Sequence, residues 1–158
     1  MSGGEEQWPD IAGQIKSRRT KEYVHMLPVR IYYEDTDFSG VVYHANYLRY
    51  AERGRSDFLR LVGRSHQQML AEEPPLVYTV HRITMTFHQP ARIDDLLEVC
   101  TQFNRITRVR LVIQQTIWRG ETLIWSADIT VACVDFEGRL KRLPDALYHC
   151  LSPYASTS

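Results

Sequence analysis

The chain has 158 residues, in which 19 lysines and arginines are balanced by 19 aspartates and glutamates. A formal net charge of zero gives no global field that would attract DNA or an anionic membrane surface. The length fits one domain with a single core. No apolar run approaches the roughly 20 residues that are needed to cross a bilayer.

The cysteines indicate neither a zinc site nor a disulfide framework. Cys100, Cys133 and Cys150 are odd in number and widely spaced, and no CxxC pair or Cys–His cluster is present. The N-terminus lacks the apolar core of a secretory signal. We therefore expect a reducing, cytoplasmic setting.

The two ends of the chain differ in composition from the part between them. Residues 1–26 are mostly polar and are expected to be a mobile or loosely docked extension. Residues 151–158 are expected to fray, which leaves 27–150 as the folded domain. The extension carries a basic cluster, formed by Lys16, Arg18, Arg19 and Lys21.

The first predicted strand is the short β-prone run 29–33. A turn follows, and then an amphipathic helix for which the Asn46 side chain can serve as N-cap. Gly63 is well placed to end this helix after about four turns. Its polar face includes Glu52, which we interpret as a surface charge. The apolar or small face is formed by Tyr47, Tyr50, Ala51, Gly54, Phe58, Leu61 and Val62.

Four segments with alternating apolar and polar residues follow the helix. They cover 82–88, 97–103, 109–117 and 123–133. Such alternation is typical of antiparallel strands with one buried face. Arg119-Gly120-Glu121 predicts a tight hairpin between the last two strands. One helix packed on one antiparallel sheet, an α+β fold, would bury both apolar faces.

The turn before the helix holds the residues best suited to chemistry. Asp37 can act as a general base or as a nucleophile. The backbone amides of Tyr43, His44 and Ala45 lie where a helix begins, and there unpaired N–H groups can hold a developing oxyanion. Gly40 would let the chain turn back, so that the carboxylate and the amides face one point.

The same residues also allow simpler interpretations. An Asp-x-x-Gly sequence is usually a plain turn, in which the aspartate bonds its own backbone. A histidine just before a helix is usually a capping or solvent-facing residue, which applies to His44. Glu34 or Asp35 could be the working carboxylate instead, since Asp35 and Asp37 point to the same side of an extended strand.

Residues 33–47, which read YEDTDFSGVVYHANY, resemble the signature of hot-dog-fold acyl-CoA thioesterases of the 4-hydroxybenzoyl-CoA thioesterase family. Within that family they are most similar to the bacterial branch encoded beside the Tol–Pal envelope genes. The similarity continues through residues 52–55 (ERGR) and 87–95 (FHQPARIDD), and it spans roughly residues 28–145.

The resemblance implies a five-stranded antiparallel sheet wrapped around one long central helix. It also implies an enzyme that hydrolyses acyl-CoA to free acid and CoA without a metal or other cofactor. The catalytic carboxylate maps onto Asp37, and the amide that polarises the thioester carbonyl maps onto His44. Four further residues of the loop are expected to contact substrate: Gly40, Tyr43, Asn46 and Tyr47. From charge and position alone, we assign the CoA phosphates to Arg105, Arg108 and Arg110.

The resemblance further implies a homodimer or tetramer in which the site forms between two subunits. Two alternatives stay open. One is an acyl-thioester hydratase or dehydratase that pairs Asp37 with His44. The other is an envelope or lipid-synthesis module that docks acyl carrier protein through the basic cluster near the N-terminus. The preferred acyl group, short, long or aromatic, is not predicted.

Overall fold

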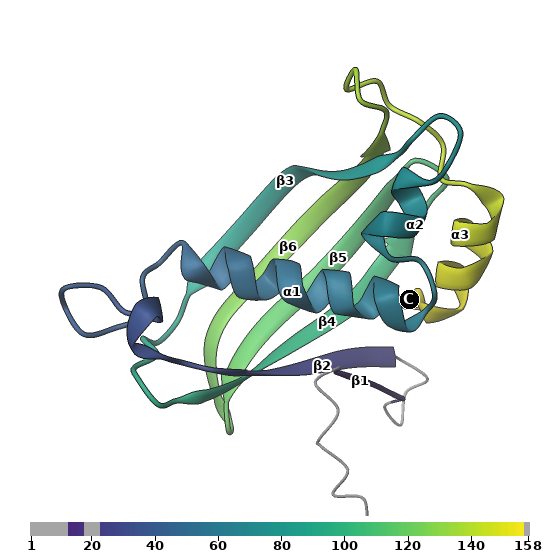
Figure 1. The fold of residues 1–158 in the computed structure, drawn as a ribbon. Helices are drawn as coiled ribbons and strands as arrows, with labels where there is room; N and C mark the ends of the chain where they lie inside the picture. The colour runs from purple at the N-terminus through teal and green to yellow at the C-terminus, as the bar shows by residue number, and fades with distance from the viewer. Residues whose placement is uncertain (1–12, 18–22, 157–158) are drawn as a thin grey trace, which may run out of the picture.

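A six-stranded antiparallel sheet wraps around one long helix in the computed structural model, which describes residues 13–17 and 23–156 (Figure 1). The strand order in the sheet is β1-β2-β4-β5-β6-β3. The strands are β1 Gln14–Ser17, β2 Tyr23–Arg30, β3 Val77–Phe87, β4 Leu96–Ile106, β5 Arg110–Arg119 and β6 Thr122–Val134. The helices are α1 Asn46–Leu61, α2 His66–Leu70 and α3 Asp145–Leu151, with 3-10 turns η1 Tyr33–Asp35 and η2 Ser152–Tyr154. This architecture confirms the predicted α+β fold.

The central helix α1 ends as predicted but begins differently. Gly63 adopts a φ of 79°, and the N–H of Arg64 bonds the carbonyl of Leu59 at 2.8 Å, which closes the last turn. At the other end the N-cap is Ala45, which has no capping side chain. Asn46 is instead the first helical residue, so the predicted capping role of Asn46 is wrong.

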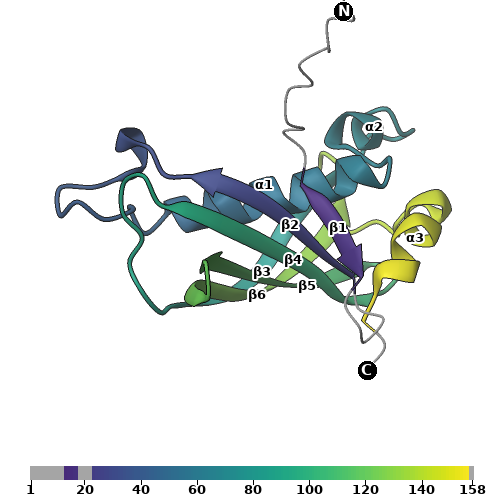
Figure 2. The same cartoon turned by 90° about the horizontal axis from the view of Figure 1, so that it is seen from below.

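The first strand lies earlier in the chain than predicted. Strand β2 ends at Arg30, and residues 33–35 form a 3-10 turn rather than extended chain. Both β1 and the first half of β2 fall within residues 1–26, and β1 lies along β2 at one edge of the sheet (Figure 2). The sheet therefore has six strands rather than five. Most of the predicted basic cluster lies outside the described residues.

Three of the four later strands match the predicted segments closely, and the fourth, β3, begins five residues earlier than the alternation indicated. The β5–β6 hairpin is tight, since Arg119 pairs with Thr122 across a turn in which Gly120 has a φ of 58°. In the described part of the chain, no helix is long and apolar enough to cross a membrane.

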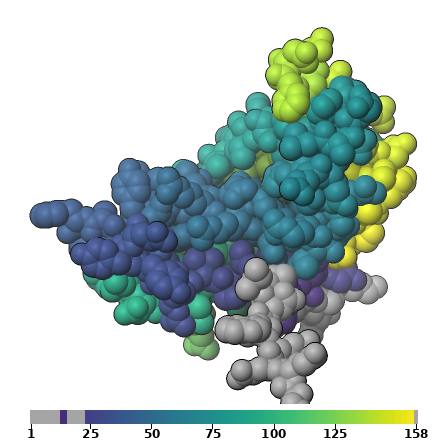
Figure 3. All heavy atoms as spheres, in the orientation of Figure 1, coloured from purple at the N-terminus to yellow at the C-terminus, as the bar shows by residue number. Residues whose placement is uncertain are grey.

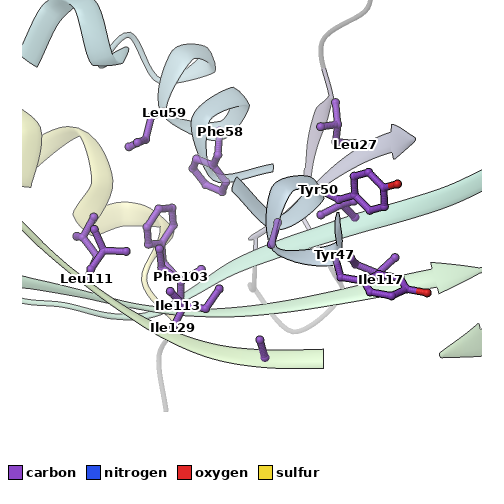
Figure 4. Close-up of a cluster of buried hydrophobic side chains, with 14 of the residues drawn as sticks. Leu27, Tyr47, Tyr50, Phe58, Leu59, Phe103, Leu111, Ile113, Ile117 and Ile129 are labelled. Carbon is purple, nitrogen blue, oxygen red and sulfur yellow. The ribbon is translucent and has the colours of Figure 1, made fainter. Parts of the chain in front are cut away.

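The core lies between α1 and the sheet, where Tyr50 and Phe58 of the helix meet strand residues such as Phe103 and Ile113 (Figure 4). Helix and sheet approach closely at Gly54. A Cβ atom there would lie 2.9 Å from Oγ1 of Thr101 and 3.0 Å from Cγ1 of Val99. The missing side chain therefore sets how closely α1 sits on the sheet.

A buried amide fixes the helix at that distance. The Nε2 group of Gln115 in β5 donates to the carbonyl of Ala51 and to Oγ1 of Thr101, both at 2.8 Å. Its Oε1 atom accepts from Arg55 at 2.9 Å. Because every polar atom of this side chain has a partner, its burial costs little free energy.

Strand β3 is the second edge of the sheet, and much of it is uncovered. Val80, Met85 and Phe87 expose 44%, 38% and 49% of their surface. The period-two pattern predicted a buried face for Met85 and Phe87. The described residues of one copy leave that face uncovered.

Candidate active site

The loop between η1 and α1 projects from one end of the molecule and contains the predicted catalytic turn (Figures 1 and 3). Thr36 bridges to Val42, and the N–H of Asp37 bonds the carbonyl of Val41 at 2.9 Å. The N–H of Gly40 returns to the carbonyl of Asp37 at 3.0 Å, and Gly40 has a φ of 81°. Glycine is the residue that adopts this conformation without strain, so the predicted turn at Gly40 is confirmed.

Asp37 is exposed at the start of this turn and is held through one of its two carboxylate oxygens. Oδ1 accepts hydrogen bonds from the hydroxyl of Ser39 at 2.6 Å and from its backbone N–H at 2.8 Å. These bonds, with a smaller contribution from the charge of His44, hold the pKa of Asp37 below its ordinary value. The backbone N–H of Val41 also faces the carboxylate and lowers its pKa. The carboxylate is thus charged at neutral pH, and Ser39 orients it through Oδ1.

The start of α1 leaves two amides available beside Asp37. The N–H of Tyr43 bonds the carbonyl of Asp35 at 2.9 Å, so it is not free to hold an oxyanion, contrary to our expectation. The N–H groups of His44 and Ala45 have no backbone partner among the described residues. Because they begin a helix of 16 residues, they also lie at the positive end of its dipole.

Asn46 fixes the loop onto the helix. It is buried, and its Nδ2 group donates to the carbonyl of Asp35 at 2.9 Å, the same oxygen that Tyr43 uses. The Asn46 side chain therefore positions the loop. The side chain of Tyr43 is exposed, and its ring lies 4.5 Å from that of His44.

Tyr47 lies one turn further on and lines a small cavity beside the catalytic turn. Its hydroxyl accepts a hydrogen bond from the N–H of Ala91 at 3.2 Å, and burial raises its pKa. Its ring contacts that of Phe87, with centroids 5.8 Å apart. The cavity has a volume of about 250 Å³ and is also lined by His44 and His88.

The neighbouring carboxylates are arranged differently from Asp37. Asp35 belongs to the 3-10 turn, and its Oδ2 atom accepts from the N–H of Tyr32 at 2.8 Å. Asp35 and Asp37 were expected on the same side of an extended strand, but residues 33–35 form a 3-10 turn instead. Glu34 is exposed in the same turn.

The three predicted CoA arginines lie at the opposite end of the sheet from the Asp37 turn of the same copy (Figure 1). Arg108 pairs with Asp145, and its guanidinium lies 3.9 Å from the ring centre of Tyr148. Arg105 and Arg110 are exposed on β4 and β5.

Sequence reasoning missed one polar cluster. The hydroxyl of Ser56 donates to Oε1 of Glu52 at 2.6 Å and lies 2.8 Å from Nε2 of His66. Glu52 and Ser56 are four residues apart, the spacing of neighbours on one face of a helix, so their contact could have been predicted from the sequence. His66 belongs to α2, a helix that was not predicted. Within the described ranges, no group of three His, Cys, Asp or Glu side chains is placed to hold a metal ion.

Comparisons with known proteins identify the family and agree with the fold. The sequence model of the thioesterase superfamily matches residues 39–125. The acyl-CoA thioester hydrolase YbgC of Escherichia coli O6:H1 is 43% identical over 121 residues, which cover 76% of this chain and 87% of that protein. The acyl-CoA thioesterase YbgC of Haemophilus influenzae is 40% identical over 114 residues, which cover 72% and 82%.

Solved structures lead to the same family. The crystal structure of a probable thioesterase from Bartonella henselae superposes with a TM-score of 0.75 at 40% identity, and the match covers 77% of this chain and 99% of that one. The chain described here belongs to the thioesterase superfamily.

Proposed function

We propose that this protein hydrolyses acyl-CoA thioesters to a free acid and CoA. The observation that carries the proposal is the charged carboxylate of Asp37 in the loop that leads into α1, where the N–H groups of His44 and Ala45 have no backbone partner among the described residues. Relatives that are 40–43% identical carry the name acyl-CoA thioester hydrolase or thioesterase, which supports the same reaction.

In the proposed reaction, the thioester carbonyl oxygen accepts a hydrogen bond from the N–H of His44. This bond strengthens as the oxygen gains negative charge, and such a donor contributes about 10²–10³ in rate in acyl-transfer enzymes. Asp37 takes a proton from a water molecule that attacks the carbonyl carbon, or attacks that carbon itself to form an anhydride that water then cleaves. Collapse of the tetrahedral intermediate breaks the C–S bond and releases CoA as a thiolate.

We infer that a second copy of the chain completes the site by pairing along β3. This strand of 11 residues is an open edge, and an open edge readily accepts another strand. Its exposed apolar residues need a cover. Phe38, at the tip of the catalytic turn, exposes its whole side chain and would gain the same cover from a partner.

We assign the CoA phosphates to Arg105 and Arg110, which are exposed cations on neighbouring strands. Arg108 is a weaker candidate because Asp145 already neutralises it. Acyl carrier protein is also a proposed partner. Comparing the rates at which one acyl group is hydrolysed from CoA and from acyl carrier protein tests this proposal. Cys100, Cys133 and Cys150 form no disulfide within the described residues, and we propose a reducing compartment such as the cytoplasm.

A hydratase or dehydratase is the second candidate, because His44 lies close enough to Asp37 to lower its pKa. That reaction would form enoyl-CoA from hydroxyacyl-CoA without releasing thiol. Liquid chromatography of the products distinguishes the two reactions.

The deciding experiment measures free-thiol release from short, long and aromatic acyl-CoAs. Asp37→Asn removes the charge and keeps the shape, so we expect turnover to fall by about two orders of magnitude or more. Glu34→Gln is the matched control, since it makes the same change at the exposed neighbouring carboxylate and should leave turnover near the wild-type value. Equal losses in both variants, or none in Asp37→Asn, would refute the assignment of Asp37.

A further inference from the structure

The start of α1 is bonded twice to one oxygen of the preceding loop, the backbone carbonyl of Asp35. This oxygen accepts from the N–H of Tyr43 and from Nδ2 of Asn46, both at 2.9 Å. The N–H of Asn46 in turn bonds the carbonyl of Tyr43 at 2.9 Å. Tyr43 is thus held at both its N–H and its carbonyl. The next residue is His44, whose amide is the proposed oxyanion donor.

The side chain of Asp35 anchors the residue that carries this carbonyl. Its Oδ2 atom accepts from the N–H of Tyr32 at 2.8 Å, and the N–H of Asp35 bonds the carbonyl of Tyr32 at 3.1 Å. These two bonds close the turn η1, which lies beside the start of α1 (Figure 1). Asp35 is therefore held by its own side chain just before the chain continues to Asp37.

Tyr50 of α1 faces the same carboxylate from the helix. Its side chain is fully buried, and burial together with the Asp35 carboxylate raises the pKa of its hydroxyl. Tyr50 follows Asn46 by four residues, so it lies one turn further along the same face of the helix. Asp35 therefore contacts both the first turn of α1, through its carbonyl, and the second turn, through its carboxylate.

The two aspartates of the loop are turned in different directions. The half-buried carboxylate of Asp35 faces η1 and the buried Tyr50, whereas Asp37 is exposed. Asp35 thus has the contacts of a residue that holds the loop on the helix. Asp37 has the exposure that a group attacking a substrate or activating a water needs.

We propose that Asp35 is a positioning residue, whose side chain sets Asp37 and the His44 amide in their places around the reacting carbonyl. The inference rests on the proposed function and adds to that site a residue that does not touch the substrate. Asp35 precedes Asp37 by two residues, and its carbonyl holds the residue before His44. A shift of Asp35 therefore moves the two reacting groups relative to each other, and a misplacement of about 1 Å can lower a rate by about 100-fold.

Asp35→Ala and Asp35→Asn separate positioning from chemistry. Alanine removes both side-chain contacts, whereas asparagine loses the charge but keeps an oxygen that accepts from the N–H of Tyr32. In Asp35→Ala we expect kcat for thiol release to fall by about 10- to 100-fold, with KM changed by less than about threefold. Asp35→Asn should retain at least about a third of the wild-type kcat.

Glu34→Ala is the matched control, because it truncates the exposed neighbouring carboxylate of the same turn and should leave kcat near the wild-type value. An Asp35→Asn protein as inactive as Asp37→Asn would overturn the proposal, since the charge of Asp35 would then be required. An unchanged kcat in Asp35→Ala would overturn it as well.

Tyr50→Phe tests the contact with the helix, because it removes only the hydroxyl. We expect kcat to fall by about three- to tenfold in the wild-type background, the size of the loss of one hydrogen bond. In the Asp35→Ala background the same substitution should have no further effect, because the hydroxyl acts through Asp35. Equal losses in the two backgrounds would contradict that contact.

Hydrogen exchange of backbone amides, followed by mass spectrometry, gives a readout that does not depend on turnover. Peptides that contain residues 41–46 should exchange faster in Asp35→Ala than in the wild type, and at the wild-type rate in Asp35→Asn. Thermal melting verifies that each variant is folded at the assay temperature. Unchanged exchange in Asp35→Ala would overturn the positioning role. A wild type that releases no thiol, with exchange that changes as expected, would instead refute the proposed function and leave Asp35 as the residue that holds the loop.

Discussion

Asp37 and Ser39 are joined by two hydrogen bonds, since both the hydroxyl and the backbone N–H of Ser39 donate to Oδ1 of Asp37. The hydroxyl bond is the largest of the interactions that lower the pKa of Asp37. Such bonds are typical of a plain turn. Here they also fix the orientation of the carboxylate that we propose as the base or nucleophile.

We predict that Ser39→Ala moves the acidic limb of the pH profile of kcat/KM to higher pH. The active form of Asp37 is the carboxylate, so activity is lost as pH falls through its pKa. The wild-type pKa lies below the ordinary value, and loss of the hydroxyl bond raises it. Turnover above pH 7 should change little, since the carboxylate is charged there in both proteins. Thiol release measured across pH tests this directly.

Ser152→Ala is the control for that profile, because Ser152 lies in η2, away from the catalytic turn. Its profile should coincide with that of the wild type. A Ser39→Ala profile that also coincides would contradict the idea that the Ser39 hydroxyl holds the working carboxylate.

The open edge of β3 gives a second prediction. Met85→Lys places a charge on the exposed apolar surface of that strand, where two copies of the strand would meet. We expect the dimer to dissociate and kcat/KM to fall by about tenfold or more, because each site needs groups from both copies. Sedimentation velocity and thiol release measure the two effects.

Leu96→Lys makes a similar change at a comparably exposed residue of β4. It should leave both the sedimentation coefficient and the rate unchanged. A wild-type protein that sediments as an active monomer would rule out the β3 pairing and the shared site together.

Much of this fold could be predicted because its elements show clear periodicity. The apolar face of α1 and the alternation in four strands follow directly from the core that they enclose. Strand β1 and helices α2 and α3 have between four and seven residues each, too few for a period to be recognised. The early start of β2 was missed because the polarity of residues 1–26 led us to expect a mobile or loosely docked extension there.

The site was predictable where it depends on the chain's own turn and not where it depends on tertiary contacts. Asp37 and the His44 amide were identified from their place before a helix. The occupied amide of Tyr43 depends on where the carbonyl of Asp35 points, which no local pattern specifies. His66 meets Ser56 only because α2 folds back onto α1.

Gly54→Ala should destabilise the fold, although alanine is the better helix former. The added Cβ would lie within 3.1 Å of side-chain atoms of Thr101, Val99 and Gln115, all buried in the sheet. We expect a loss of about 1–3 kcal/mol, because the helix must move outward and stretch the bonds of Gln115. Urea denaturation measures this loss of stability. The control is Arg53→Ala, at an exposed neighbouring residue, which should change the free energy of unfolding by less than about 0.5 kcal/mol. A stabilised Gly54→Ala protein would show that the helix can move away from the sheet without cost.

The other end of α1 holds a buried pair that should make stability depend on pH. His25 of β2 is fully buried, and its Nε2 atom lies 2.7 Å from Oδ2 of Asp57. The N–H of Gly13 donates to the same oxygen at 2.8 Å, which attaches the chain just before β1 to the helix. Burial lowers the pKa of His25, and the contact with Asp57 only partly opposes this effect.

Proton linkage gives the direction in which stability changes with pH. The folded state binds fewer protons than the unfolded chain, in which histidine has a pKa of about 6.5. The contribution of His25 to stability is therefore complete above that pKa and is lost as the pH falls toward the folded-state value. We expect the urea midpoint of the wild type to decrease between pH 7.5 and pH 5.5. His25→Gln retains a donor for Asp57 but does not titrate, so its midpoint should decrease less. Parallel decreases in the two proteins would mean that other groups control the acid sensitivity and that His25 is already protonated when folded.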